Sequence, residues 1–262
     1  MSDSWQARVA NALGPTRAAL ALGGGAWRVR AGDRDLVVKL GEGALDEADG
    51  LRHLAGVAGA PPVPEVVLAE PDLLVTTYVR QGPRTTAHEE ALGWMLASLH
   101  SAAWPEWGGG SSFIGACTVD PAVAASAVVF YEARLLELAR RCRLEDLVSD
   151  VTARLGDLLP PGGPALLHGD LWWGNVLWGA DGRPWLIDPS VHGGYPEEDL
   201  AMLGLFAPVP ERLAGAYAEI RPPDPGWEDR VPLFQLYPLL VHAVLFGGGY
   251  RARAAAVARR FA

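Results

Sequence analysis

The chain has 262 residues, of which 50% are hydrophobic and 20% charged, with 31 glycines and 21 prolines. Such a composition is typical of a globular protein and excludes a disordered, collagen-like or coiled-coil chain. Acidic side chains outnumber basic ones by 31 to 22, for a formal net charge of −9, and no basic run offers a surface for nucleic acid or an anionic membrane. We therefore expect neither as a partner.

No targeting or membrane-spanning segment is expected. The sequence begins at Met1 without the basic and apolar regions of a secretory signal, and its most apolar stretch, residues 231–246, is interrupted by Gln235, Pro238 and His242. Two cysteines are too few for a disulfide framework. We expect a soluble, cytoplasmic protein whose oligomeric state the sequence leaves open.

The first third of the chain predicts a short helix followed by a strand-rich region. Ser4 can cap a helix over residues 4–12. Apolar runs bounded by turn residues predict five strands, over residues 20–22, 27–30, 35–40, 66–68 and 73–79. Apolar residues at helical spacing predict one main helix over residues 44–58, between the third and fourth strands.

The sequence after Gly82-Pro83 predicts mainly helices. Thr86 can cap the first of them, and a loop rich in tryptophan and glycine follows it. The expected helices cover residues 86–101, 121–143, 145–158 and most of 200–262. A strand-rich region followed by a helical one indicates an α+β fold in two lobes, over residues 1–79 and 80–262.

The segment Leu166 to Asn175 carries the clearest chemical motif. Its sequence, LLHGDLWWGN, places Asp170 five residues before Asn175, the spacing of the catalytic loop of protein kinases, with Gly169 where they have arginine. A carboxylate can accept the proton of an attacking hydroxyl, and an amide oxygen is a hard ligand suited to Mg²⁺. The motif therefore predicts phosphoryl transfer, with Asp170 as the base.

A predicted hairpin brings a second oxygen ligand to this motif. Asp181-Gly182 is a strong signal for a two-residue turn between apolar runs. With these two residues as the loop, Asn175 would face Asp188, with Cβ atoms about 4.5–5.5 Å apart. The register thus predicts a metal site formed by Asn175 and Asp188, beside Asp170.

Lys39 is the only lysine among the 22 basic residues, and it ends a predicted strand. A compact ammonium group is suited to phosphate oxygens of changing geometry, and kinases place such a lysine on their third strand. Glu47, on the following helix, is the expected ion-pair partner, although other acids lie nearby in the sequence, at Glu42, Asp46 and Asp49.

Three consecutive glycines, Gly23, Gly24 and Gly25, precede Lys39 by two predicted strands. A glycine turn lets backbone amides approach phosphate groups closely. Three glycines alone predict only a turn, so it is their position relative to Lys39 that indicates a phosphate-binding turn.

These segments together resemble the fructosamine kinase (ketosamine 3-kinase) family, in the aminoglycoside phosphotransferase-like branch of the protein-kinase fold. The resemblance covers nearly the full length. It rests on the segments HGDLW and GN within 168–175, IDP at 187–189, EDLAM at 198–202, EADGL at 47–51, VPEV at 63–66 and SFIG at 112–115.

The resemblance implies ATP- and Mg²⁺-dependent phosphorylation of a small-molecule ketosamine, usually at its 3-hydroxyl, as a deglycation step. It implies a small antiparallel-sheet lobe with one main helix and a larger, mostly helical lobe. Its implied site comprises Asp170 as base, Asn175 and Asp188 as Mg²⁺ ligands, Lys39 with Glu47 as the phosphate-positioning pair, Tyr78 and Val79 at adenine, and Asp199 as a structural cap on the catalytic loop. Thr76-Thr77 departs from the acidic residue that many relatives have before the hinge.

The aromatic and acidic residues around the motif have two interpretations each. Trp172 and Trp173 either pack in the core or stack against the sugar or its amine, because an aromatic face attracts a cation. Glu197 and Glu198 could attract the same amine, but we expect them to be solvated at the surface. His168 is expected to shape the loop by packing and hydrogen bonding rather than to bind metal.

Two other functions are compatible with the same residues. A related kinase acting on an aminoglycoside, choline or homoserine would share the reacting core and differ in the acceptor pocket of the helical lobe. A catalytically silent binding protein with a kinase fold would also retain much of the sequence. The presence of every expected reacting group argues against the silent protein.

Overall fold

A five-stranded antiparallel sheet forms most of the first third of the chain. The computed structural model describes residues 4–262 and orders the strands β1-β2-β3-β5-β4. They are β1 (Thr16–Gly23), β2 (Ala26–Ala31), β3 (Arg34–Leu40), β4 (Val66–Glu70) and β5 (Leu73–Thr77). All five predicted strands are confirmed, with β1 starting earlier and β5 ending earlier than expected.

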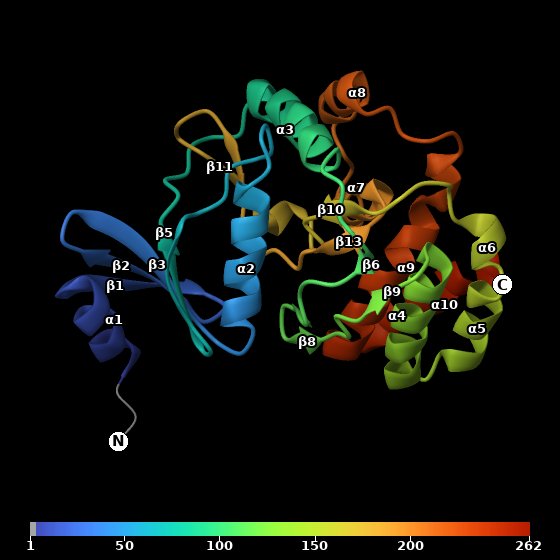
Figure 1. Ribbon diagram of the computed structural model, residues 1–262, viewed down its shortest axis with the longest axis horizontal. Coiled ribbons are helices and arrows are strands. Elements are labelled where there is room, and N and C mark those ends of the chain that lie inside the picture. The colour runs from blue at the N-terminus through green and yellow to red at the C-terminus, as the bar shows by residue number, and fades with distance from the viewer. Residues whose placement is uncertain (1–3) are drawn as a thin grey trace.

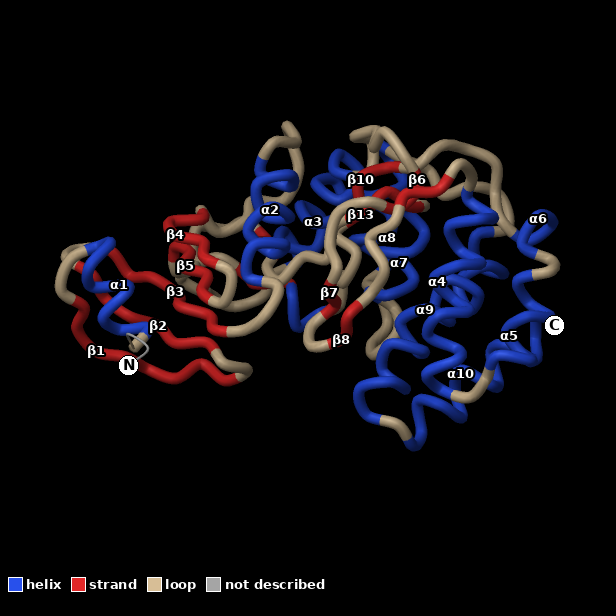
Figure 2. The backbone as a smooth tube through the Cα atoms, turned by 60° about the horizontal axis from the view of Figure 1, so that its bottom comes forward, coloured by secondary structure: helices blue, strands red, loops and turns tan. Residues whose placement is uncertain are grey.

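One helix covers each face of this sheet. Successive strand residues point to opposite faces, so Leu73 and Val75 of β5 pack in the cluster that contains Val9 of α1 (Trp5–Leu13), whereas Leu74 packs with α2 (Ala44–Ala55). Figure 2 shows α2 standing between the sheet and the helical part of the molecule.

The same alternation directs Lys39 toward the helical lobe. On β3, Leu36 and Val38 are buried in the cluster on the α1 side. Lys39 therefore points to the opposite face, where α2 lies.

The rest of the chain is mainly helical, and Figure 1 shows it as the larger lobe. Its helices are α3 (Thr86–Leu99), α4 (Ala127–Cys142), α5 (Glu145–Thr152), α6 (Leu155–Leu158), α7 (Pro196–Leu203), α8 (Glu211–Ile220), α9 (Trp227–Phe246) and α10 (Gly248–Phe261). Its short strands form one four-stranded sheet, in the order β10-β13-β6-β9, and two hairpins, β7-β8 and β11-β12. They are β6 (Trp107–Gly108), β7 (Phe113–Ile114), β8 (Cys117–Thr118), β9 (Val123–Ala124), β10 (Ala165–Leu167), β11 (Val176–Trp178), β12 (Pro184–Leu186) and β13 (His192–Gly194).

Three helix predictions in this lobe differ from the structure: one in the capping residue, one in the first residue and one in the number of helices. α3 is capped by Thr85, whose hydroxyl accepts from the amide of His88, rather than by Thr86. α4 begins six residues later than predicted, at Ala127, because residues before it pair as strands and Ser126 provides the cap. The helix predicted over 145–158 is two helices, α5 and α6.

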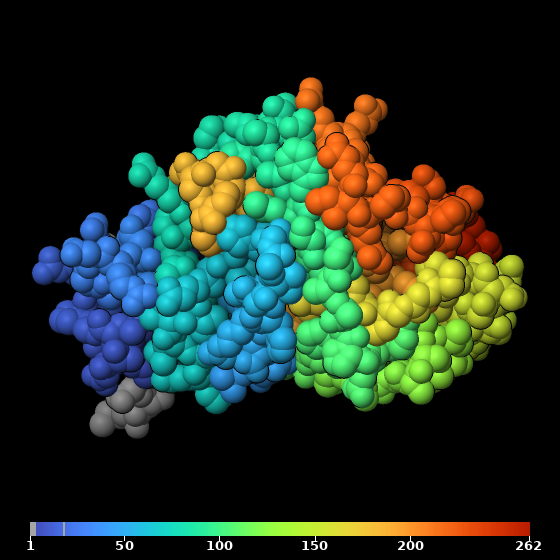
Figure 3. Space-filling model, turned by 45° about the horizontal axis from the view of Figure 1, so that its top comes forward, coloured from blue at the N-terminus to red at the C-terminus, as the bar shows by residue number. Residues whose placement is uncertain are grey.

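The β11–β12 hairpin packs against the connection between the two lobes. The amide of Gly82 donates to the carbonyl of Trp178 at 2.7 Å, and the amide of Ala180 donates to the carbonyl of Arg80 at 2.8 Å. In Figure 3 the hairpin appears as a gold segment lodged beside the teal chain of the connection. These bonds join the hairpin to residues 80–82, which follow β5.

Within residues 4–262, the structure contains no helix with the length and apolar content needed to cross a membrane.

The contact between α3 and α8 leaves no room for a side chain at Gly93. A Cβ atom there would lie 2.4 Å from the carbonyl oxygen of Leu213 and 2.9 Å from the Cβ of Ala216. We expect Gly93→Ala to lower the free energy of unfolding by about 1–3 kcal/mol through overpacking. Gly215→Ala, on α8 with nothing within 4 Å of its Cβ, is the matched control. It should raise stability by about 0.5–1 kcal/mol, and denaturant unfolding that ranks the two variants equally would contradict the packing argument.

Candidate active site

The loop after β10 has a backbone conformation that favours glycine at residue 169. Gly169 has a φ of +81°, and a Cβ there would lie 1.9 Å from the carbonyl oxygen of Ser190. The amide of Ser190 donates to the carbonyl of His168 at 2.8 Å. Glycine in place of the kinase arginine therefore allows the catalytic loop and the segment after Asp188 to lie side by side.

Asp170 and Asn175 lie together in this loop. The amide nitrogen of Asn175 donates to the backbone carbonyl of Asp170 at 2.8 Å and to its carboxylate at 3.2 Å. Because these bonds use the nitrogen of Asn175, its oxygen is left to face the cleft. Burial raises the pKa of Asp170 to about 7, an effect that the hydrogen bond from Asn175 opposes. A carboxylate with a pKa near neutrality is suited to accept a proton.

The predicted register of the β11–β12 hairpin is wrong by one residue. Val176 pairs with Leu186. The carbonyl of Asn175 accepts from the amide of Ile187 at 3.1 Å, so the residue opposite Asn175 is Ile187 and not Asp188. The loop holds three residues, 180–182, because Gly182 takes a φ of +81°, as in three-residue hairpins with a glycine in the left-handed region.

The backbone conformation of Asp188 turns this residue toward the cleft. It has a φ of +56°, in a region that residues other than glycine rarely adopt. It follows directly after the last hairpin pair and, with Asn175, lines the same cavity as Asp170. The predicted meeting of the three residues is therefore observed, although a strained turn produces it instead of cross-strand pairing.

Lys39 connects the sheet to this cluster. Its Nζ atom lies 2.8 Å from Oε2 of Glu47 and 2.8 Å from Oδ1 of Asp188. Burial lowers the pKa of Lys39, but the charges of Glu47 and Asp188 raise it by more, so the group remains an ammonium. The expected ion pair with Glu47 is present, and the competing acids of the sequence do not replace it.

A cleft of about 620 Å³ opens at this cluster. Its lining includes the five side chains just described, Lys39, Glu47, Asp170, Asn175 and Asp188, together with Gly24 and Trp172. The turn at residues 23–25 has positive φ at all three glycines, which matches its hairpin geometry, and it places Gly24 at the wall of the cleft.

A second cavity, of about 330 Å³, adjoins the first behind Lys39. Gly23, Tyr78 and Val79 line it, and Lys39 and Asp188 belong to both cavities. The amide of Tyr78 donates to the carbonyl of Asp35 at 3.0 Å, which extends the pairing of β5 with β3. Of the backbone groups of Tyr78, only the carbonyl is therefore left for a ligand.

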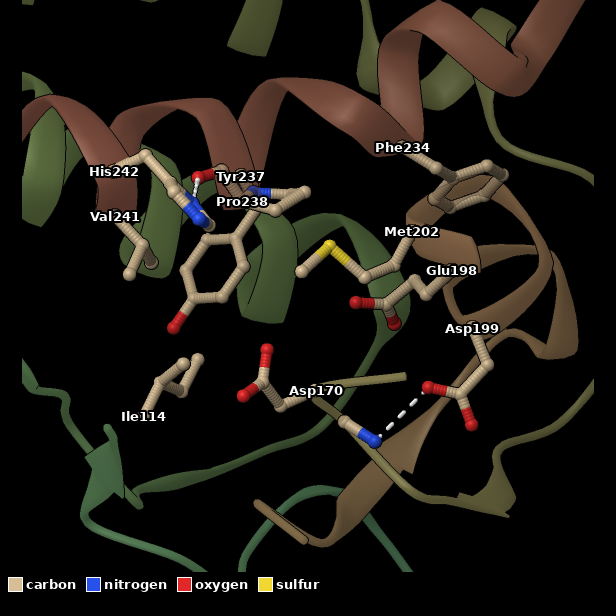
Figure 4. A pocket seen from close by; sticks show the side chains of 11 residues that line it. Ile114, Asp170, Glu198, Asp199, Met202, Phe234, Tyr237, Pro238, Val241 and His242 are labelled. Atoms are coloured by element: carbon tan, nitrogen blue, oxygen red, sulfur yellow. Dashed lines mark hydrogen bonds between the residues drawn. The ribbon is translucent and has the colours of Figure 1, made fainter. Parts of the chain in front are cut away.

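A small hollow of about 20 Å³ lies on the other side of Asp170. Figure 4 shows the Asp170 carboxylate pointing toward Ile114, with Tyr237 and Val241 of α9 above. Asp170 thus stands at the boundary between the large cleft and this hollow, which is where a base would meet an acceptor.

Asp199, near the start of α7, holds the catalytic loop. Its carboxylate accepts from the amides of His168 and Gly169 at 2.7 and 2.9 Å and from Nε2 of His100 at 3.1 Å. Burial raises the pKa of Asp199, but these hydrogen bonds, the one from His100 foremost, lower it below its ordinary value. The carboxylate is therefore ionised and supports the loop through its backbone.

His168 contacts the loop through both ring nitrogens. Its Nδ1 accepts from the amide of Asp170 at 3.3 Å, so its Nε2 carries the proton that is donated to the carbonyl of Ile187 at 3.0 Å. Burial lowers the pKa of His168, in agreement with a neutral ring.

The two tryptophans of the motif have different positions. Trp172 is 40% exposed and lines the large cleft. Trp173 packs against Trp178, with ring centroids 6.2 Å apart, and below the guanidinium of Arg84. Trp172 is therefore placed where it can contact a ligand in the cleft, whereas Trp173 packs against other side chains of the protein.

Comparison with known proteins shows the family of the chain. A model of the fructosamine kinase family matches residues 24–261. The chain belongs to the fructosamine kinase family. Membership makes it an ATP-dependent phosphotransferase that acts on a hydroxyl group.

Similar proteins match most of the length of this chain. A Klebsiella aerogenes protein named "probable ketoamine kinase" is 34% identical over 245 residues, which is 85% of this chain and 84% of the relative. The crystal structure of a candidate fructosamine-3-kinase from Thermobifida fusca superposes with a TM-score of 0.90 at 36% identity, over 99% of this chain and 98% of that one.

A more distant structure confirms the protein-kinase-like fold. An aminoglycoside phosphotransferase in a ternary complex with ADP and hygromycin B has a TM-score of 0.66 at 19% identity, over 97% of each chain. The two-lobed α+β architecture of the fructosamine kinase chain is therefore that of small-molecule kinases.

The oxygen donors of this fructosamine kinase site fit a magnesium ion. Mg²⁺ is commonly held by one or two carboxylates together with phosphates and water. In the part of the chain that the structure describes, no group of three or more His, Cys, Asp or Glu is placed to hold a metal. The oxygens of Asn175 and Asp188, which both line the cleft, would supply two such ligands, and a phosphate chain and water would supply the others.

Three buried residues near the site were not correctly predicted from the sequence: His100, Glu197 and Glu198. His100 links Asp199 to the hydroxyl of Tyr217, at 2.9 Å, but its spacing from other polar residues gave no signal. Glu197 and Glu198, expected at the surface, are buried and paired with Arg230 and Arg134. Their partners are distant in sequence, so the expectation of solvated acids is wrong.

Asp199→Asn tests the support of the catalytic loop. The amide that replaces one oxygen would leave a buried donor without an acceptor, so we expect the free energy of unfolding at pH 7 to fall by about 1–3 kcal/mol. Because folding lowers the pKa of Asp199, its contribution is present above about pH 4 and is lost as pH falls through the folded value.

Denaturant unfolding between pH 3 and 7 measures the effect of Asp199→Asn, and the variant should lose less stability with acid than the parent. Asp157→Asn, at an exposed acid on α6, is the control and should stay within about 0.5 kcal/mol of the parent. Equal stability of the parent and Asp199→Asn across this range would contradict the assignment.

Proposed function

We propose that the protein transfers the γ-phosphoryl group of ATP to the 3-hydroxyl of a sugar-derived ketosamine, as a step in deglycation. The observation that carries the proposal is the meeting of Lys39 from the sheet with Asp188 from the helical lobe, beside Asp170. The names of the similar proteins, ketoamine kinase and fructosamine-3-kinase, support the choice of a ketosamine.

The nucleotide occupies the two larger cavities in this proposal. The 330 Å³ cavity takes adenine, which meets the Tyr78 carbonyl and the backbone of Val79. The phosphates lie in the 620 Å³ cleft, between the glycine turn at 23–25 and Lys39, which Glu47 holds in place. Residues 1–79 then serve as the nucleotide-binding lobe and residues 80–262 as the acceptor lobe.

Asn175 and Asp188 hold Mg²⁺ in this arrangement. The ion, when bound, neutralises charge on the phosphates. Phosphoryl transfer requires positioning and charge neutralisation more than covalent chemistry, and Lys39 adds a second positive charge at the same place. In this proposal the residues at the cleft therefore serve both positioning and charge neutralisation.

Asp170 acts as the base at the boundary between cleft and hollow. Its carboxylate orients the acceptor hydroxyl toward the phosphates and accepts its proton as the bond to phosphorus forms. His168 and Asp199 position the loop without touching the substrate, and Trp172 offers an exposed aromatic face at which the acceptor sugar or its amine can pack.

A nucleotide-turnover screen tests the proposed acceptor. Synthetic fructosamines, ribulosamines and erythrulosamines are compared with an aminoglycoside, choline and homoserine by ADP release in the presence of Mg²⁺. We expect turnover with ketosamines, and mass spectrometry with phosphorus NMR to locate the phosphate at the 3-hydroxyl. Turnover confined to one of the other acceptors would replace the ketosamine proposal, and ATP consumption without any phosphorylated acceptor would favour the silent binding protein.

Asp170→Asn tests the role of the base. The variant keeps a hydrogen-bond acceptor beside Asn175 but cannot take a proton, so we expect kcat to fall by about 100-fold or more. Nucleotide affinity, measured by isothermal titration, should stay within about threefold because Asp170 makes no contact with Lys39 or Glu47 in the structure. Turnover within tenfold of the parent would remove Asp170 from this role.

A further inference from the structure

The β7–β8 hairpin belongs to none of the roles assigned so far, although it carries the SFIG segment at residues 112–115. Phe113 and Ile114 pair with Cys117 and Thr118, and Gly115 turns the chain with a φ of +55°. Gly115 and Ala116, at the tip, are exposed and line the large cleft.

The two residues of β7 contact two different compartments. Neighbouring strand residues point to opposite faces. Phe113 lines the large cleft and packs so closely on the start of α2 that a Cβ at Gly43 would lie 3.0 Å from its ring. Ile114 lines the small hollow, where Figure 4 shows it opposite the carboxylate of Asp170.

The hairpin is anchored on both sides of the cleft. The amide of Ser112 donates to Oδ2 of Asp46, on α2, at 2.7 Å. From the helical lobe, the hydroxyl of Ser190 donates to the carbonyl of Phe113 at 2.8 Å. The position of Ile114 is thereby fixed relative to the helix that carries Glu47 and to the segment that follows Asp188.

Ile114 limits the space at the base to one small group. Its side chain is only 8% exposed, and the hollow that it closes with Met202 and Val241 holds about 20 Å³. A cavity needs about 10–15 Å³ to admit one water molecule. The hollow therefore admits about one water-sized group beside Asp170, a position that either an acceptor hydroxyl or a water molecule can occupy.

We propose that Ile114 is a specificity-determining residue, which packs the acceptor hydroxyl against Asp170 and thereby excludes water from the phosphoryl group. The inference rests on the proposed function, since it assumes that an acceptor hydroxyl meets Asp170. Water is the competing nucleophile. In that reaction its oxygen bonds to the γ-phosphorus while the bond from this phosphorus to the oxygen of ADP breaks, and the water proton passes to Asp170, giving ADP and inorganic phosphate.

Two variants test the inference: Ile114→Ala, which removes most of the side chain, and Ile114→Val, which removes one methylene group. In Mg²⁺ and ATP without acceptor, ADP release should rise by about tenfold for the alanine variant and about two- to threefold for the valine variant, because each enlarges the space open to water. With saturating fructosamine, the ratio of ADP formed to acceptor phosphorylated should rise above its value in the parent.

The comparison of Michaelis constants separates this role from general damage. The KM for the acceptor should rise about tenfold in Ile114→Ala while the KM for ATP stays within about twofold. Ile220→Ala is the matched control, because Ile220 is half exposed at the end of α8 and lines none of the three cavities. Thermal unfolding checks that each variant is folded. If Ile114→Ala is not folded, the measurements on Ile114→Val decide the test.

Acceptor-free ADP release within 1.5-fold of the parent in both variants, or an equal rise in Ile220→Ala, would overturn the inference, as would a parallel rise in the KM for ATP. If the parent phosphorylates no ketosamine, the proposed function fails. The acceptor-free measurement then still decides whether Ile114 excludes water.

Discussion

One partly buried ammonium group joins the two lobes at the cleft. Lys39, from the sheet, lies within 2.9 Å of both Glu47, on α2, and Asp188, in the helical lobe. An ammonium removed from water is stable only with compensating charges, so the three side chains depend on one another. Lys39 and Asp188 line both of the larger cavities, so this contact lies where the two cavities adjoin.

The reacting groups of the helical lobe are positioned mainly through the backbone. Gly169 permits the close approach of the catalytic loop to Ser190, and Asp199 holds the amides of this loop from below. Both contacts act on the backbone of the loop, which in turn sets the position of Asp170. The β7–β8 hairpin, bonded to Asp46 on one side and to Ser190 on the other, then completes the wall opposite the base.

The strands of the sheet and the ion pair of Lys39 were predictable because they depend on local signals. Alternation of side chains along β3 directs Lys39 toward α2, and no other lysine competes with it. The register of the β11–β12 hairpin was not predictable, since a two-residue and a three-residue loop fit the same Asp181-Gly182 signal and differ by one residue. The burial of Glu198 was also missed, because its partner Arg134 lies 64 residues away in the chain.

The sequence by itself determined the residue types on which the proposed chemistry depends: a carboxylate and an amide in the spacing of a kinase, a second carboxylate, a lone lysine and a glycine turn. These features are local, and the residue types limit what they can do. Only the tertiary structure decided which groups meet, how Asp188 turns into the cleft and why Ile114 faces Asp170 across a hollow of about 20 Å³. Such relations arise from the packing of distant segments against one another, which spacing along the chain does not encode.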